Sequence, residues 1–204
     1  MKSIEDTLRI INNIVKSINR YDRINIALIG GYASIAHGVE RTTSDVDFCI
    51  FSDIIYKKNT ADFVDLLKKV VPANFEIEYI EGSKILDDTF RHDIIFIHDK
   101  SGEYPKIDLI IARYKWELEG IESAALLEDI PFPVLPKPYL IAMKLKAGSL
   151  KDDYDIVELY KLLTEEEKTK THELANSIHR DKKLARLIKP PKARLEKEDT
   201  SLLI

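Results

Sequence analysis

Two aspartates one residue apart, Asp45 and Asp47, are the residues of this chain best suited to chemistry. They stand at the start of an apolar run, and a β-strand points residues i and i+2 to the same face, about 7 Å apart. Two carboxylates on one face repel each other and lose hydration unless a cation lies between them. Oxygen ligands of this kind favour Mg²⁺ or Mn²⁺. A bare pair with this spacing is more often a polar strand end with two solvated acids, so the neighbouring sequence must decide.

The residues before the pair favour a site for a phosphorylated ligand. An apolar run ends in Gly30-Gly31, and glycine lets the backbone approach a phosphate closely and adopt a positive φ. A helix from Tyr32 to His37 would add free amides as a second anion-binding feature. The segment Arg41-Thr42-Thr43-Ser44 then leads directly into the aspartates and supplies a cation and hydroxyl groups.

Taken in order, these motifs resemble the nucleotidyltransferase superfamily with the DNA polymerase β-like palm. The matching pieces are Gly30-Gly31, Ala33, His37-Gly38, Arg41, Ser44 and Asp45-Val46-Asp47. The family carries a third acid on a later strand, and the matching candidate is Asp108 in the apolar run PKIDLIIA. The resemblance covers roughly residues 25–112. It implies an α/β (α+β) fold, in which a mixed sheet with flanking helices is followed by a smaller helical part.

The resemblance also implies a reaction: a nucleoside monophosphate moves from an NTP such as ATP to a hydroxyl group, and pyrophosphate is released. Three carboxylates would be catalytic and would hold Mg²⁺ (or Mn²⁺) ions between the triphosphate and the attacking oxygen: Asp45, Asp47 and Asp108. Gly30 and Gly31 would bind the β- and γ-phosphates through their amides, and Arg41 and Ser44 would add phosphate contacts.

A second charged motif lies further along the chain, where Lys144-Leu145-Lys146-Ala147 precedes Lys151-Asp152-Asp153-Tyr154-Asp155. It resembles a motif of the abortive-infection type branch of the superfamily, which includes minimal nucleotidyltransferases. The resemblance implies that Lys144 neutralises triphosphate charge. Asp152 would cap the next helix, and Asp155 would complete the nucleotide site by orienting Lys144 or the acceptor. The doubled acid Asp152-Asp153 leaves the register open by one residue, and ordinary caps and surface charges are the alternative.

The acceptor is left open: a small molecule, a protein hydroxyl or a tRNA end. Residues 180–197 contain eight Lys or Arg against two acids, so this segment carries +6 and the remainder −10. Such a segment can hold RNA phosphates, or it can be a solvated helix end followed by a flexible tail. The whole-chain charge of −4 opposes RNA and favours a small-molecule or protein acceptor slightly. The alternative to an enzyme is a catalytically inactive protein that binds a nucleotide or a partner in a toxin–antitoxin-like system. The presence of all three candidate acids argues against this alternative.

Composition limits the class of protein. The 204 residues are 45% hydrophobic, which suffices for a packed core. The single cysteine, Cys49, excludes an internal disulfide and alternates with Phe48 and Ile50 as a core residue. No apolar run approaches the roughly 18–20 residues of a membrane span, and the N-terminus is unlike a signal peptide. These features predict a cytoplasmic protein without membrane contact.

Apolar periodicity predicts the elements that must position these residues. We expect helices at 4–18, 61–71, 115–127, 139–147, 153–163 and 165–178. We expect strands at 25–29, 45–51, 75–79, 94–97 and 107–112. Ser3 and Asp6 are spaced as a capping box for the first helix.

Four prolines crowd the positions between these two parts: Pro131, Pro133, Pro136 and Pro138. Each lacks an amide donor, so we expect neither helix nor interior strand there. This places a catalytic core at 1–130, a helical C-terminal part at 136–188 and a flexible basic tail at 189–204.

Some residues keep two interpretations. His37 either contacts a phosphate or packs behind the Gly-Gly turn, and His92 and His98 have no assignable role. Asp93 or Asp99 would replace Asp108 as the third acid if Asp108 pointed away from the site.

Overall fold

The computed structural model describes residues 2–82 and 91–189, which form seven strands and nine helices. The strands are β1 (Ile24–Ile29), β2 (Val46–Ser52), β3 (Phe75–Ile80), β4 (Ile94–Asp99), β5 (Ile107–Ile111), β6 (Ala125–Leu126) and β7 (Pro133–Val134). The helices are α1 (Ile4–Ile18), α2 (Gly30–Ala36), α3 (Asp53–Lys57), α4 (Thr60–Val70), α5 (Lys115–Glu122), α6 (Lys137–Ala147), α7 (Leu150–Lys161), α8 (Glu165–Ser177) and α9 (Asp181–Leu187).

The strands form one mixed sheet in the order β3-β4-β5-β2-β1-β7-β6. β2 lies at its centre, antiparallel to β1 and parallel to β5. The side chains of Val46, Phe48 and Ile50 on β2 are completely buried, because this central strand points alternate residues into the core. The mixed α/β fold expected from the sequence is therefore confirmed.

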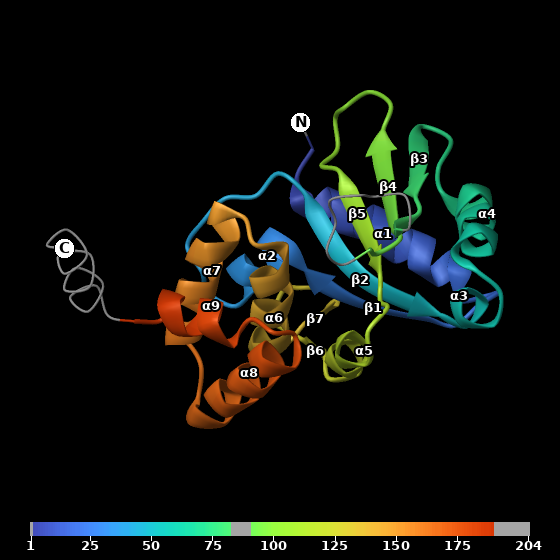
Figure 1. Cartoon of the computed structure of the whole chain (residues 1–204). Coiled ribbons are helices and arrows are strands. Elements are labelled where there is room, and N and C mark those ends of the chain that lie inside the picture. The colour runs from blue at the N-terminus through green and yellow to red at the C-terminus, as the bar shows by residue number, and fades with distance from the viewer. Residues whose placement is uncertain (1, 83–90, 190–204) are drawn as a thin grey trace, which may run out of the picture.

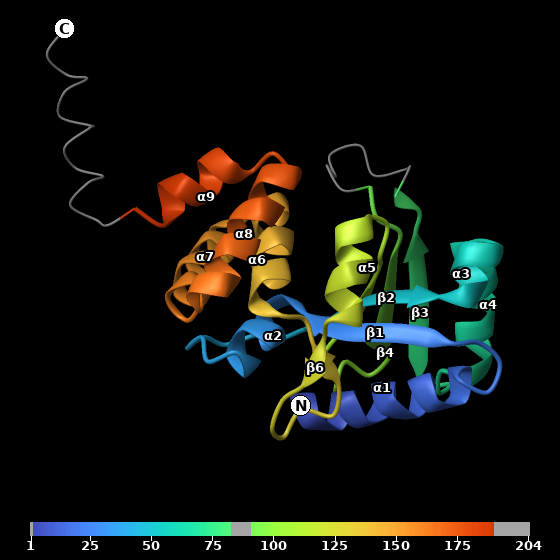
Figure 2. The same ribbon diagram turned by 90° about the horizontal axis from the view of Figure 1, so that it is seen from below.

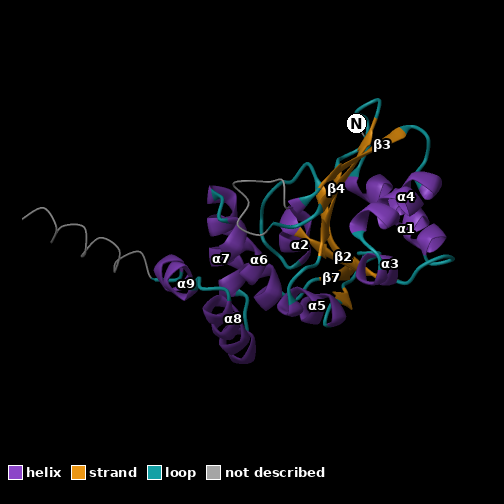
Figure 3. Ribbon diagram, turned by 45° about the vertical axis from the view of Figure 1, so that its right-hand side comes forward, coloured by secondary structure: helices purple, strands orange, loops and turns teal. Residues whose placement is uncertain are grey.

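Helices cover the two faces of the sheet unequally. Figure 3 shows α1, α3 and α4 on one side and α2, α6 and α7 on the other. The first group lies on the side to which the buried residues of β4 and β5 point. These residues include Ile95, Ile97 and Leu109. The opposite face of these two strands carries half-exposed side chains, so this part of the sheet stays accessible on the side where α6 and α7 lie.

The C-terminal helices α6 to α9 pack together beside the sheet (Figures 1 and 2). α6 is their centre: residues from Pro138 to Leu145 are buried, and it contacts α2, α5, α7 and α8. Gly148 ends it in the left-handed conformation, at φ 79°. Capping boxes begin α7 at Ser149 and α8 at Thr164, and Ser3 with Asp6 begins α1 as predicted.

The expectation for the proline-rich segment was wrong in two respects. β7 includes Pro133 and lies inside the sheet between β1 and β6. It can do so because it is two residues long and the amide of Leu135, which follows it, bonds to the Leu28 carbonyl at 3.0 Å. α6 includes Pro138 in its first turn, where an amide needs no partner inside the helix.

Other boundaries also differ from the prediction. α5 ends at Glu122 instead of residue 127, because Ala125–Leu126 pairs with Pro133–Val134 as β6. α2 begins at Gly30, so the glycines lie within the helix and not in a turn before it. α3 and α9 were not expected. None of the described helices combines the length and apolar character needed to cross a membrane. The division at residue 130 stays a prediction.

Candidate active site

The Gly-Gly segment packs directly against Asp47. Gly30 has a φ of +66°, and a Cβ added to it would lie 1.9 Å from Asp47 Oδ2. The backbone amide of Gly31 lies close enough to the same carboxylate to favour its charged form. Glycine is therefore required at position 30 for both conformation and space. The Gly31 amide, which we expected to bind phosphate, already interacts with an acid.

Gly30→Ala is expected to destabilise the fold by about 3 kcal/mol or more, because a left-handed conformation and a steric clash add their costs. Gly102→Ala is the matched control, since Gly102 has a φ of +69° and nothing within 4 Å of an added Cβ. The control should cost only about 1–2 kcal/mol. Urea unfolding of both variants measures the difference, and equal losses would contradict the clash.

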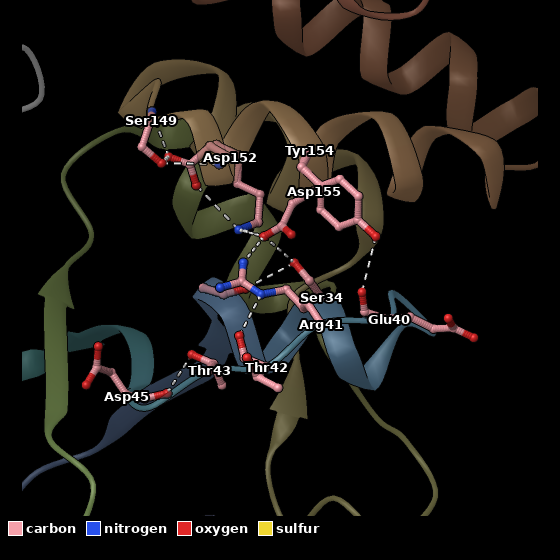
Figure 4. Close-up of polar contacts among 12 residues, drawn as sticks. Ser34, Glu40, Arg41, Thr42, Thr43, Asp45, Ser149, Asp152, Tyr154 and Asp155 are labelled. Carbon is pink, nitrogen blue, oxygen red and sulfur yellow. Dashed lines mark hydrogen bonds and ion pairs between the residues drawn. The ribbon is translucent and has the colours of Figure 1, made fainter.

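Asp47 and Asp108 are direct neighbours across two parallel strands. Their Cα atoms pair in the register of β2 and β5, so their side chains share one face of the sheet. Asp45 lies just before β2, and its backbone carbonyl accepts a hydrogen bond of 3.4 Å from the Thr43 hydroxyl (Figure 4). We expected Asp45 and Asp47 side by side on one strand. Asp47 lies on β2, whereas Asp45 belongs to the loop that leads into it.

These acids are electrostatically unfavourable in the metal-free protein. Burial first, and then the charges of Asp108 and Asp45, raise the pKa of Asp47 to about 6, against the lowering effects of Lys144 and the Gly31 amide. Burial also raises the pKa of Asp108, against the nearby charge of Lys106. Such a site gains stability from any cation that binds between the carboxylates.

The residues present fit a divalent cation that shares its ligands with a substrate. No three His, Cys, Asp or Glu side chains of residues 2–82 and 91–189 gather as a self-sufficient metal site. Asp108 Oδ1, however, is buried without a hydrogen-bond partner in this part of the chain. Mg²⁺ commonly binds one or two carboxylates and completes its shell with water and substrate phosphates. The acids therefore suit a metal–nucleotide complex better than a resident metal.

A buried ion-pair cluster lies across from the acids (Figure 4). Asp155 on α7 is 0% exposed, and its Oδ2 lies 2.5 Å from both Arg41 Nη1 and Lys144 Nζ. Ser34 on α2 donates a third hydrogen bond to the same oxygen, at 3.2 Å. One carboxylate thus holds together a cation from the loop before β2 and a cation from α6.

Asp155 does not line the cleft, so any part in nucleotide binding is through Arg41 and Lys144. Asp152 lies 3.5 Å from Lys144 and forms the capping box of α7 with Ser149, which is the N-cap residue itself. The expectation that Asp152 caps this helix is confirmed, although it does so from the third helical position.

A cleft of about 660 Å³ joins these parts. Among its lining residues are seven of the predicted site residues: Gly30, Gly31, Arg41, Ser44, Asp45, Asp47 and Lys144. Asp108 and Asp155 are not among them. Sequence reasoning missed an apolar half of the cleft: Ile94, Ile110, Leu140, Met143 and Ala147. The cleft therefore has both charged and apolar lining residues, which suits a nucleotide with its charged phosphates and its apolar base.

The remaining candidates have structural contacts. His37 Nε2 lies 2.8 Å from the Leu135 carbonyl, and burial lowers its pKa, so it packs behind the glycine segment. His92 is buried against Glu117 at 2.9 Å and lines the cleft. Asp93 accepts hydrogen bonds from Tyr79 and Gly82, and Asp99 accepts from Asn74 and Glu103. Neither acid is needed as a substitute for Asp108, whose side chain shares the face of Asp47.

Residues 18–202 match the family model described as the nucleotidyl transferase AbiEii toxin of type IV toxin–antitoxin systems. No curated protein matches the chain significantly.

The solved structures that are similar to this chain include the following three. An antigenic nucleotidyltransferase-like protein from Paracoccidioides brasiliensis has 20% identity and a TM-score of 0.48, over 90% of this chain and 91% of that chain. ANT(2″)-Ia in complex with adenylyl-2″-tobramycin has 13% identity and a TM-score of 0.49, over 84% and 98%. Terminal uridylyl transferase 4 from Trypanosoma brucei with bound CTP has 15% identity and a TM-score of 0.41, over 79% and 53%.

Proposed function

This chain belongs to the AbiEii family of nucleotidyl transferase toxins, and we propose that it moves a nucleoside monophosphate from an NTP such as ATP to a hydroxyl acceptor with the help of Mg²⁺ or Mn²⁺. The observation that carries the proposal is the register of Asp47 beside Asp108, together with the cleft that Asp47 and Lys144 both line. Carboxylates that repel one another on one wall and a lysine on the other suit a metal–triphosphate complex.

In this proposal, three acids hold the ions, which when bound neutralise the triphosphate and activate the acceptor oxygen: Asp45, Asp47 and Asp108. Arg41 and Lys144, both fixed by Asp155, face the phosphates, and Ser44 adds a hydroxyl contact. The new bond joins the acceptor oxygen to the α-phosphorus, the bond from that phosphorus to the β-phosphate oxygen breaks, and pyrophosphate leaves. Asp108 accepts the proton of the acceptor hydroxyl.

The test uses the four NTPs, each labelled at the α-phosphate, with Mg²⁺ and a cell extract. Label should pass from at least one NTP to a discrete acceptor, and the Asp47→Asn variant should transfer none. The labelled molecule identifies the acceptor as a small molecule, a protein or an RNA. Nucleotide binding without any transfer would support the idle alternative, a nucleotide- or partner-binding component of a toxin–antitoxin system. An antitoxin protein is a candidate partner in either case.

One surface feature supports an RNA acceptor as the second candidate. A hollow of about 460 Å³ on and before α9 is lined by His179, Arg180, Lys182, Lys183 and Arg186. Lys183 Nζ lies 2.8 Å from Asp153 Oδ1, and its position beside Gly148 links this hollow to the loop at the cleft. The acidic balance of the whole chain still favours a small-molecule or protein acceptor slightly.

The two classes of acceptor differ in salt dependence. If α9 binds RNA phosphates, replacing Arg180, Lys182 and Arg186 by glutamine should reduce the slope of log affinity for tRNA against log salt by about two to three units. The matched control replaces Arg9, Lys57 and Lys68 by glutamine, which removes the same charge from α1, α3 and α4 on the far side of the sheet. Equal slopes for wild type and both variants would exclude this surface as an RNA contact.

A further inference from the structure

The cleft face of the sheet continues beyond the acids, across β5 and β4 to β3. The strand register places Asp108 beside Phe96, and Phe96 beside Glu78, in one row with Asp47. Lys106 precedes Asp108 by two residues, so its side chain emerges on the same face. Phe96, Lys106 and Asp108 are all half-buried, and the buried residues of β4 and β5 alternate with them toward α1 and α4.

Lys106 contacts both of its neighbours on this face. Its Nζ lies 3.3 Å from Asp108 Oδ1 and 3.7 Å from the centroid of the Phe96 ring. The side chains of Lys106 and Asp108 are 39% and 21% exposed, so the pair is partly screened by water. The contact is an ion pair without hydrogen-bond geometry, because Asp108 Oδ1 is buried and has no hydrogen-bond partner among the described residues.

We propose that Lys106 is a positioning residue that competes with a divalent cation for Asp108. When the cation binds, the ammonium group of Lys106 leaves the carboxylate and stays in contact with the Phe96 ring. This inference rests on the proposed function, because it takes Asp108 as a metal ligand. A divalent cation and an ammonium group repel each other strongly at contact distance, so both cannot occupy one carboxylate oxygen. A lysine is a single point charge on a flexible stem, and it already contacts the ring.

The competition has a consequence for the order of binding. With Lys106 at Asp108, the nucleotide-free protein offers a cation mainly Asp45 and Asp47, and affinity for the metal alone is reduced. The phosphates of an NTP bring further oxygen ligands, and a metal–NTP complex can then displace Lys106. Lys106 thus favours arrival of the metal together with the nucleotide.

The experiment titrates the nucleotide-free full chain with Mn²⁺ and measures affinity by calorimetry. Lys106→Met keeps the aliphatic stem and removes the charge, and it should raise Mn²⁺ affinity by about 2–5-fold, the range expected for a partly screened ion pair. A gain in affinity cannot result from misfolding. Lys106→Arg keeps the charge and should leave the affinity within about twofold of wild type, because a guanidinium still competes for the carboxylate.

Two further variants separate local competition from the loss of a positive charge. Lys115 on α5 is 92% exposed, and Lys115→Met should leave Mn²⁺ affinity unchanged. In an Asp108→Asn background, Lys106→Met should have no further effect, since the partner of the competition is absent.

Several results would overturn the inference: no rise with Lys106→Met, an equal rise with Lys115→Met, an equal rise in the Asp108→Asn background, or no Mn²⁺ binding by any variant. The label-transfer assay is independent of this titration. Absence of transfer with the expected Mn²⁺ pattern would reject the proposed function and leave the competition standing. Transfer without the expected Mn²⁺ pattern would reject the competition by Lys106 and leave the proposed function standing.

Discussion

Replacing Asp47 by asparagine is expected to abolish nucleotidyl transfer and to make the metal-free fold more stable above about pH 6. The activity is lost because an amide cannot replace a carboxylate as a ligand for a hard cation, and a loss on the order of 10³-fold or more is expected. The stability is gained because the folded protein holds Asp47 as a charge that burial and the charges of Asp108 and Asp45 disfavour.

The pH dependence follows from the raised pKa of Asp47, which is about 6 in the fold against an ordinary value of 3.8. Between these pH values the folded chain keeps a proton that the unfolded chain has released, so the wild-type free energy of unfolding falls as pH rises. Below pH 3.8 this contribution is absent, and above about pH 6 it is complete. Two pKa units correspond to at most about 3 kcal/mol, and Asp47→Asn should remove most of this fall.

Urea unfolding at pH 5 and pH 8 in the presence of a chelator measures the effect. Asp65→Asn is the control, because Asp65 on α4 is 68% exposed and lies on the far side of the sheet. The control should keep both the wild-type transfer rate and the wild-type pH profile. If Asp47→Asn retained near-wild-type transfer, the metal role of this acid would be wrong.

Replacing Asp155 by asparagine should cost both stability and transfer. Asp155 is completely buried and compensates two cations, Arg41 and Lys144, through one oxygen. Its loss leaves Arg41 without its carboxylate partner and Lys144 with only Asp152, at 3.5 Å, and breaking a buried ion pair typically costs about 3–5 kcal/mol. Transfer should fall by about 100-fold or more, because neither cation is then fixed toward the phosphates.

Asp153→Asn is the matched control for this prediction, since Asp153 stands on the same helix in an ion pair with Lys183 at 2.8 Å. That pair is partly exposed, so its loss should cost less than about 1 kcal/mol. Adding Lys144→Met to Asp155→Asn should restore part of the stability by removing one of the two cations, while transfer stays lost. Chemical unfolding and label transfer are the two measurements. If Asp155→Asn were as stable as wild type, the buried ion pairs of Asp155 would not stabilise the fold, and the prediction would be wrong.

Much of the fold could be predicted from local patterns. β1 to β5 were each expected within two residues of their observed ends, because buried central strands repeat apolar residues with period two. The short strands β6 and β7 could not be predicted this way, since two residues carry no period and β7 pairs with β1, which is distant in the sequence. For the same reason the helix from Lys115 was extended too far.

The sequence alone also predicted the acids as candidates for the site. The spacing of Asp45 and Asp47 behind two glycines is a local property that predicted an acid pair. The structure places Asp47 on β2 and Asp45 in the loop before it. Family resemblance added Asp108, Lys144 and Asp155 as candidates, without saying how they meet.

Only the tertiary structure decided which of these groups touch. Asp108 lies beside Asp47 because β2 and β5 pair in parallel in one particular register, and a shift of one residue would turn it to the other face. Asp155 meets Arg41, 114 residues away, because α7 packs over the loop before β2. The competing contact of Lys106 with Asp108 and Phe96 requires two neighbouring strands. Such contacts depend on chain packing, and local sequence does not encode the distances between segments that are remote along the chain.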